Sequence, residues 1–220
     1  MSFIVVLYAQ LSEKKSEDIA LQKYLQSLPD EMVSGILKYR DVQEQRLRLG
    51  GKLLLAQILG HFNLEHLLLK HIQKSDNHKP FFPLQNFQFN SAYSGNICIC
   101  AGTTNADIGI DIEQIKPVNT ALLLPYLTTK EQTLIAGNTA SIAAFYEIWV
   151  KKEAVLKATG YMLDNNFLNK IETQNEPVKF DGKNIYTKYI YPEEGYIACI
   201  ASDKKINTEA FVLKKIDLNI

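Results

Sequence analysis

The chain has 220 residues, of which 46% are hydrophobic and 22% charged, and its 24 basic and 24 acidic residues give a formal net charge of +0. This balance is ordinary for a soluble globular protein and argues against one that coats nucleic acid, since such proteins carry a basic excess. No run of about 18 apolar residues occurs, so we expect no membrane span. Three cysteines without CxxC spacing are typical of a reducing cytoplasm, which is the expected location.

Strand and helix patterns alternate along the chain. The spacing of apolar residues predicts, in chain order, a strand over 3–9, helices over 16–27 and 30–60, strands over 66–72, 87–90, 96–101 and 108–115, a helix over 145–160, and strands over 185–191, 196–202 and 210–216. We expect the second helical run to break near Asp41 or at Gly50-Gly51, because paired glycines weaken a helix interior. Residues 77–83 contain two prolines and predict a loop, since proline cannot donate to a strand ladder.

The stretch 102–107 separates two halves whose predicted elements follow a similar order. It is the expected interdomain linker, and it divides the chain into an N-terminal lobe, residues 1–105, and a C-terminal lobe, residues 106–220. Residues 196–202 loosely echo residues 96–102. We interpret this as a hint of internal duplication, not as a detectable repeat.

Basic residues gather in the second helical run, where Arg40, Arg46, Arg48 and Lys52 lie. A solvated helix face is the expected role of most of them. Further along, Ser91-Ala-Tyr-Ser-Gly95 is small and polar. Such a stretch either lets backbone N–H groups approach an anion or forms a hairpin turn, and by itself it favours the turn.

Acidic residues alternate with isoleucines in the predicted strand after the linker. Ile108, Ile110 and Ile112 face one way, and Asp111 and Glu113 face the other. One interpretation is the polar outer face of a half-buried strand. The other is a mount for Mg²⁺, which prefers oxygen ligands and typically takes a few carboxylates together with substrate phosphates.

The predicted helix over 145–160 carries a further carboxylate among lysines. Glu153 and Lys157 are four residues apart and meet on one helix face, and Lys151 and Lys152 lie next to them. Such pairs decorate many surface helices. If this helix packs beside the acidic strand, however, Glu153 becomes its third carboxylate. Carboxylates, lysine and a divalent metal are then suited to phosphoryl transfer.

These residues carry a family resemblance. Gly109-Ile-Asp-Ile-Glu113 followed by Trp149-x-x-Lys152-Glu153-x-x-x-Lys157 resembles the signature pair of the 4′-phosphopantetheinyl transferase superfamily. His78-Lys-Pro80, and Phe89-Asn90 with Ser94-Gly95, lie upstream in the matching order. The length and N-terminal half resemble the large, two-lobed Sfp-type branch. The resemblance covers residues 38–160, and residues 161–220 carry no motif that we match.

The resemblance implies a fold of the α/β (α+β) class, with two similar lobes related by a pseudo-twofold axis. Each lobe would be a small, mainly antiparallel sheet packed with a long helix. The implied activity is transfer of 4′-phosphopantetheine from coenzyme A to a serine of an acyl or peptidyl carrier protein, with release of adenosine 3′,5′-bisphosphate. Mg²⁺ would be the cofactor and coenzyme A the co-substrate. We expect a cytoplasmic monomer that binds neither nucleic acid nor membrane.

The same resemblance implies roles for individual residues. Asp111, Glu113 and Glu153 would hold the metal, and Glu153 would also activate the carrier serine. Lys157 would contact the phosphates and assist the leaving group. The implied coenzyme A positions are Arg46, Lys79, Tyr93, Ser94 and Lys157. Glu131 matches a further acidic residue of the family, although Thr128-x-x-Glu131 is also an ordinary capping box. Lys151 lies outside the motif and is expected on the surface.

The sequence departs from the family pattern in one place. Where the family has Asn-x-Ser-His-Ser-Gly, this chain has Asn90-Ser-Ala-Tyr-Ser-Gly95, so Ala92 and Tyr93 replace Ser and His. Tyrosine brings no positive charge, and a lost charge-assisted hydrogen bond costs about 1 to 2 kcal/mol of affinity. We expect weaker coenzyme A binding or a rearranged phosphate site. The alternatives are a degenerate, non-catalytic carrier-protein or nucleotide-binding module, and a different Mg²⁺-dependent phosphotransferase.

Overall fold

A computed structural model gives the arrangement of the chain. It describes residues 3–12, 19–26, 28–67, 69–77, 79–83, 86–136, 141–161 and 165–220. His78 of the predicted His-Lys-Pro motif lies outside the described residues, whereas Lys79 lies within them. Among the helices in these ranges, none combines the length and the apolar character needed to cross a membrane.

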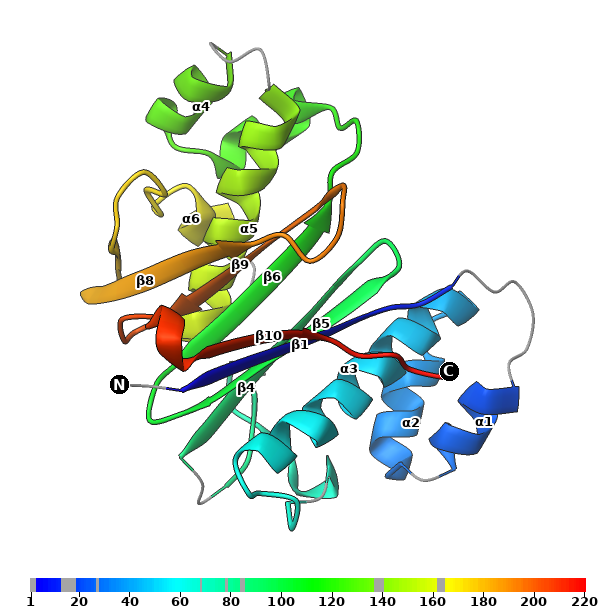
Figure 1. The fold of residues 1–220 in the computed structure, drawn as a ribbon. Helices are drawn as coiled ribbons and strands as arrows, with labels where there is room; N and C mark the ends of the chain where they lie inside the picture. Colours follow the sequence, from blue (N-terminus) through cyan, green and yellow to red (C-terminus); the bar gives the residue numbers. More distant parts are fainter. Residues whose placement is uncertain are drawn as a thin grey trace.

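The first sheet contains strands from both ends of the chain. Across the sheet their order is β10 (Phe211–Lys215), β1 (Ile4–Gln10), β5 (Ile97–Thr104) and β4 (Phe87–Ser94). β1 pairs with β10 in parallel and with β5 in antiparallel, and β4 pairs with β5 in antiparallel. Figure 1 shows the blue β1 and the red β10 side by side. The strand predicted over 210–216 therefore exists, but it joins the sheet of the first half and not that of the second.

The second sheet is built from strands that follow residue 107, and it is antiparallel throughout. Its order is β6 (Ile108–Gln114), β9 (Tyr196–Ser202), β8 (Lys183–Ile190) and β7 (Val178–Phe180). Two small sheets, each with its own helices, confirm the predicted mixed α/β class with two sheet-containing lobes.

One long helix packs on each sheet. α3 (Val42–His61) covers the first sheet and α5 (Ser141–Thr159) covers the second, and Figure 1 shows the two helices on opposite sides of the sheets. The shorter elements are α1 (Ile19–Leu25), α2 (Asp30–Leu37), α4 (Thr129–Ala136), α6 (Asn165–Leu168), the 3₁₀ turns η1 (Leu69–His71), η2 (Thr120–Tyr126) and η3 (Thr208–Ala210), and a ribbon of β2 (Gln73–Lys74) and β3 (Pro80–Phe81).

Three apolar layers hold these elements together. Leu7 and its neighbours pack beneath α3, and Cys199 lies in the layer beneath α5. The remaining faces of the two sheets pack against each other through residues such as Ile99 and Ile110. The edge strands β4 and β6 meet there, since the Asn90 side chain accepts a hydrogen bond from the Ile110 N–H at 3.0 Å. The order of layers is therefore helix, sheet, sheet, helix.

The predicted break of the second helical run occurs at Asp41 and not at the glycine pair. The Asp41 side chain caps α3 by accepting a hydrogen bond from Gln43 N at 2.7 Å. Gly50 and Gly51 stay helical because they face the sheet. A Cβ at Gly51 would lie 2.3 Å from the Tyr93 hydroxyl, so the missing side chain lets α3 approach β4 closely.

Two short predictions in the first lobe were wrong. The strand predicted over 66–72 is absent from the described residues of that stretch, which contain the 3₁₀ turn Leu69–His71. The stretch 77–83, predicted as a loop, contains β3, in which Pro80 pairs with Lys74. Pro80 is the first residue of its strand, a position that proline tolerates.

Candidate functional site

Asp111 and Glu113 lie on one face of β6, as the alternation predicts. Ile108, Ile110 and Ile112 occupy the other face and are buried between the two sheets. Asp111 is only 4% exposed, so the alternative of a solvated outer face is wrong for this residue. A buried carboxylate on a rigid strand needs partners, and α5 supplies them.

Gly109 sets the distance between β6 and α5. A Cβ at this position would lie 2.2 Å from Ala154 O and 2.3 Å from Ala158 N, both backbone atoms of the helix. Only glycine fits where two backbones approach so closely. Asp111, two residues further along the same face, thereby comes within reach of the side chains of α5.

Replacing Gly109 with alanine is expected to destabilise the protein by about 1 to 3 kcal/mol, because helix backbone cannot yield to the added methyl group. Urea unfolding followed by circular dichroism measures this loss. The control is Gly35→Ala in α2, where an added Cβ has no atom within 4 Å. That variant should gain about 0.5 to 1 kcal/mol from helix propensity. An unchanged or higher stability of Gly109→Ala would contradict the close packing.

Lys157 is the cation at the centre of the site. Its Nζ donates to Asp111 Oδ1 at 2.5 Å and lies 3.4 Å from Glu153 Oε2. Burial disfavours the charged ammonium, but the two carboxylates together outweigh burial and raise the pKa of Lys157 above its ordinary value. Lys157 therefore remains charged at neutral pH.

The carboxyl groups around Lys157 hold their protons more tightly than usual. Burial first, and then the charge of Asp111, raises the pKa of Glu153 to about 8, although Lys157 opposes this effect. Burial also raises the pKa of Asp111 and of Glu113. The Ser94 hydroxyl donates to Glu113 Oε2 at 2.7 Å and partly offsets the effect on Glu113.

The site has oxygen donors that suit a hard divalent cation. Asp111 Oδ2 is buried and has no hydrogen-bond partner among the described residues. Such atoms normally have one, so this oxygen is free to bind a ligand. Nevertheless, no group of three or more His, Cys, Asp or Glu in the described ranges is arranged to hold a metal unaided. Lys157 contacts both Asp111 and Glu153, and Glu113 accepts a hydrogen bond from Ser94.

Tyr93 and Ser94 are neighbours on β4 and therefore point to opposite faces of the strand. Ser94 points toward Glu113 of the second lobe. Tyr93 points toward α3, and the guanidinium of Arg48 lies 4.2 Å from the centre of its ring. The two predicted coenzyme A positions thus belong to different surroundings, and Tyr93 does not contact the acidic site.

A basic cavity of about 510 Å³ opens beside Tyr93, between α2, the first half of α3 and the β2–β3 ribbon. Its basic lining residues are Lys38, Arg48, Lys52, Lys70 and Lys74, and Glu31 is its acidic one among the described lining residues. Of the four basic residues for most of which a solvated face was expected, Arg40 is exposed, whereas Arg48 and Lys52 are partly buried and line this cavity. Their i, i+4 spacing is the sequence signal that could have placed them together.

Lys79 lies at the C-terminal end of α5. Its Nζ donates to Ala158 O at 3.1 Å, and it lines a second cavity of about 290 Å³ together with Asp107 and Gly160. Burial lowers the pKa of Lys79. The next residue, Pro80, lines the basic cavity, so this short segment runs from the C-terminal end of α5 to that cavity.

Arg46 is buried inside the first lobe and lines neither of these cavities. Its guanidinium donates to the carbonyl oxygens of Ser12 and Ile220 and to Gln43 Oε1, each at 2.5 Å. These contacts join the N-terminal segment, α3 and the C-terminal segment. The structure therefore places Arg46 in the scaffold of the first lobe.

Lys152 and Glu131 form a buried ion pair on α5 and α4. Lys152 Nζ lies 2.8 Å from Glu131 Oε2, both side chains are 0% exposed, and Lys152 also donates to Leu168 O and Ile171 O. Thr128 N donates to Glu131 Oε2 and Glu131 N donates to Thr128 Oγ1, so the capping-box interpretation of Thr128-x-x-Glu131 is confirmed.

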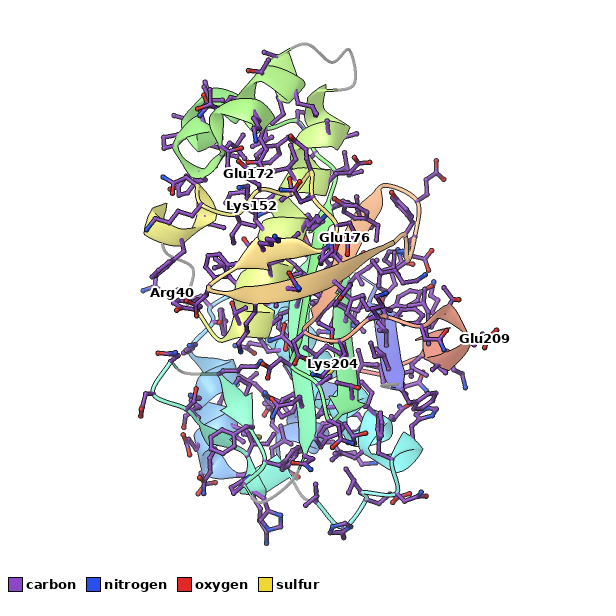
Figure 2. The ribbon with its side chains drawn as sticks, turned by 90° about the vertical axis from the view of Figure 1, so that its left-hand side faces the viewer. Arg40, Lys152, Glu172, Glu176, Lys204 and Glu209 are labelled. Carbon is purple, nitrogen blue, oxygen red and sulfur yellow. The ribbon has the colours of Figure 1, made fainter. Side chains whose placement is uncertain are left out.

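The three lysines around Glu153 have different environments. Lys157 reaches the acidic site, whereas Lys152, labelled in Figure 2, belongs to the buried scaffold. Lys151 was expected on the surface, but it is 6% exposed and pairs with Glu176 at 3.2 Å. Of these three lysines, Lys157 alone contacts the acidic residues Asp111 and Glu153.

Comparison with known proteins adds independent findings. Residues 107–210 match the profile of the 4′-phosphopantetheinyl transferase superfamily. The 4′-phosphopantetheinyl transferase gsp of Aneurinibacillus migulanus is 30% identical over 178 residues, 76% of this chain and 72% of that protein. The 4′-phosphopantetheinyl transferase HetI of Nostoc sp. is 26% identical over 184 residues, 78% of this chain and 76% of that protein. A Haemophilus influenzae protein ascribed the same activity is 31% identical over 148 residues, 62% of this chain and 63% of that protein.

Proposed function

Because the chain belongs to the 4′-phosphopantetheinyl transferase superfamily, we propose that it transfers the 4′-phosphopantetheine group of coenzyme A to a serine of an acyl or peptidyl carrier protein. The serine Oγ forms a bond to the phosphorus that carries pantetheine, the pyrophosphate bridge breaks, and adenosine 3′,5′-bisphosphate leaves. The reaction therefore needs a base for the serine proton and positive charge at the phosphates.

The observation that carries the proposal is the group formed by Asp111, Glu153 and Lys157 where β6 meets α5. It combines a buried carboxyl group that Lys157 contacts, an ammonium that stays charged, and a carboxylate with one unpartnered oxygen. These are the components that phosphoryl transfer requires in one place.

We assign the implied Mg²⁺ to the carboxylate oxygens of Asp111, Glu113 and Glu153. The unpartnered Oδ2 of Asp111 and the all-oxygen donor set support this assignment. When bound, the ion would neutralise charge on the pyrophosphate. Lys157 can then give its hydrogen bonds to phosphate oxygens in place of the carboxylates.

Two side chains would act directly on the reacting groups. Glu153 accepts the proton of the carrier serine, directly or through a water molecule. Lys157 donates to the phosphate oxygens and stabilises the charge that develops on the leaving bisphosphate. Lys79, beside the same end of α5, adds positive charge near the phosphates.

The substitution of the usual Ser-His by Ala92 and Tyr93 does not remove a group from the acidic site. Ala92 is buried between the two sheets, and Tyr93 faces α3. This placement favours an active enzyme over a non-catalytic binding module. We further propose a monomer, because one chain supplies both Ser94 from the first lobe and Glu113 from the second. We propose a cytoplasmic location because Cys98, Cys100 and Cys199 are free thiols, which are typical of a reducing compartment.

The test is incubation of the protein with coenzyme A, Mg²⁺ and several purified apo acyl and peptidyl carrier proteins, followed by mass spectrometry. We expect at least one carrier to gain the mass of one phosphopantetheine group, and chelation of Mg²⁺ to prevent the gain. If no carrier is modified, the proposed transfer is wrong. If transfer persists under chelation, the metal assignment is wrong. Binding of a nucleotide but not coenzyme A would favour a different phosphotransferase.

A further inference from the structure

We infer that Ser94 is a positioning residue, whose hydroxyl holds the carboxylate of Glu113 in the orientation that binds the metal ion, and that it is not a ligand of the coenzyme A phosphates. The inference rests on the proposed function and on the assignment of Mg²⁺ to Asp111, Glu113 and Glu153. It gives the first lobe a side chain that acts on the metal through a carboxylate of the second lobe.

Two hydrogen bonds fix the hydroxyl of Ser94. Its Oγ donates to Glu113 Oε2 at 2.7 Å and accepts from the backbone N–H of Gln114 at 3.0 Å. A serine hydroxyl has a single proton, and an N–H group can meet the oxygen only at a lone pair. The N–H of Gln114 therefore turns the hydroxyl proton toward Glu113. Because Gln114 directly follows Glu113 on β6, one hydroxyl joins the Glu113 side chain to the backbone of its own strand.

Glu113 keeps the capacity to bind a cation while Ser94 holds it. An ionised carboxylate has two oxygens with about four lone-pair positions, and the hydroxyl occupies one of them. Asp111 lies on the same face of β6, and its Oδ2 has no hydrogen-bond partner among the described residues. Carboxylates that bind metals are themselves held by hydrogen bonds, and loss of such a partner lowers metal affinity about 10- to 100-fold.

The hydroxyl of Ser94 cannot serve Glu113 and a phosphate at the same time. Phosphate oxygens accept hydrogen bonds, so a serine side chain must donate its proton to bind one. Ser94 already donates that proton to Glu113. A contact with coenzyme A would require Ser94 to release the carboxylate. The position that the family resemblance implies for coenzyme A therefore serves the acidic site in this chain.

Asn90 provides an internal comparison for Ser94. It lies four residues earlier on β4, and its Oδ1 accepts from the N–H of Ile110, which lies four residues before Gln114, at 3.0 Å. The two side chains thus make equivalent bonds from β4 to the backbone of β6. Replacing Asn90 removes a contact between the lobes. Replacing Ser94 removes such a contact and also the hydrogen bond to Glu113.

The test measures metal binding directly. Mn²⁺, which like Mg²⁺ suits carboxylate ligands, is titrated into the protein with coenzyme A and without carrier protein, and electron paramagnetic resonance counts the free ion. Competition with Mg²⁺ then gives the Mg²⁺ affinity, and a titration of coenzyme A alone is subtracted. We expect Ser94→Ala to weaken binding of both ions about tenfold. Ser94→Thr, which keeps a hydroxyl, should remain within about threefold of the wild type.

The matched control is Asn90→Ala, which should bind both ions as the wild type does. Thermal unfolding should show that Asn90→Ala and Ser94→Ala each lower Tm by about 2 to 4 °C, the loss of one contact between the lobes. Equal metal affinities of Ser94→Ala and the wild type would overturn the inference, as would a wild type that binds no Mn²⁺. An equal loss of affinity in Asn90→Ala would assign the effect to contact between the lobes.

A double-mutant cycle shows whether Ser94 acts through Glu113, and it decides the matter if threonine does not fit. Once Glu113 is replaced by alanine, Ser94→Ala should cause no further loss of metal affinity, because its partner is already absent. If Ser94→Ala costs the same tenfold in both backgrounds, Ser94 acts independently of Glu113 and the inference is wrong.

Calorimetry with coenzyme A and EDTA tests the alternative of a phosphate ligand. We expect Ser94→Ala to bind coenzyme A as the wild type does when no metal is present, whereas loss of a phosphate ligand would cost about tenfold. Carrier modification separates the inference from the proposed function. A metal affinity that depends on Ser94, in a protein that modifies no carrier, would retain the positioning role and reject the transfer. Transfer by a wild type whose metal affinity is independent of Ser94 would do the reverse.

Discussion

Glu153→Gln is expected to lower kcat for phosphopantetheine transfer by about 10²- to 10⁴-fold, which is the contribution of a positioned general base. Glutamine has the shape of glutamate but cannot take up the serine proton or hold a metal ion by charge. Glu153 is also buried, so the neutral amide should fold at least as well as the wild type. Carrier modification under single-turnover conditions gives the rate, and thermal unfolding monitors the fold.

The matched control for this variant is Glu147→Gln. Glu147 lies on the same helix, but it is exposed and does not belong to the acidic site. The same chemical change there should leave kcat within about twofold of the wild type, as expected for a substitution on the surface. If Glu153→Gln and Glu147→Gln transfer at the same rate, Glu153 is not the base.

The acidic strand shows how far the sequence alone determines the site. Period-2 alternation identifies Asp111 and Glu113 as sharing one face, and helical spacing pairs Glu153 with Lys157. Neither pattern predicts that the strand β6 and the helix α5 are in contact. That contact depends on Gly109, whose missing side chain admits the backbone of α5, and its importance is visible only when the opposing atoms are known.

The two arginines of α3 illustrate a prediction that sequence could not make correctly. Arg46 and Arg48 are two residues apart, which turns their side chains about 200° around the helix axis. One of them must therefore face inward if the other faces the cavity. A helix with glycines on its sheet side lacks a clear apolar stripe, so periodicity did not show which arginine was buried.

The pairing of strands that lie far apart in the sequence is the other feature that the sequence alone could not predict. β10 lies about 200 residues from β1 in sequence, and its apolar residues fit an edge strand of either sheet. The similar order of elements in the two halves suggested that each half folds on itself. The parallel pairing of β1 with β10 ties the last strand to the first sheet, and no local pattern encodes that choice.

Lys152→Met is expected to destabilise the protein by about 3 to 5 kcal/mol, the cost of breaking a buried ion pair by removing one partner. The variant leaves Glu131 without its counter-charge and leaves Leu168 O and Ile171 O without a donor. Chemical denaturation at pH 7 measures the loss. The control is Lys130→Met, since Lys130 pairs with Glu172 at 3.1 Å on the surface and should cost less than about 1 kcal/mol.

The pH dependence distinguishes loss of the ion pair from loss of packing. Burial alone would raise the pKa of Glu131, but Lys152 and the hydrogen bonds from Thr128 and Thr173 outweigh burial and hold it below its ordinary value. Its stabilising contribution is therefore complete above the unfolded-state pKa of about 4.3 and is lost as pH falls through the lower folded-state value. In Lys152→Met the carboxyl group of Glu131 has lost its counter-charge, so it takes up a proton more readily than in the wild type. The deficit relative to wild type should therefore be largest at pH 7 and shrink on acidification, whereas a pure packing defect would cost the same at every pH.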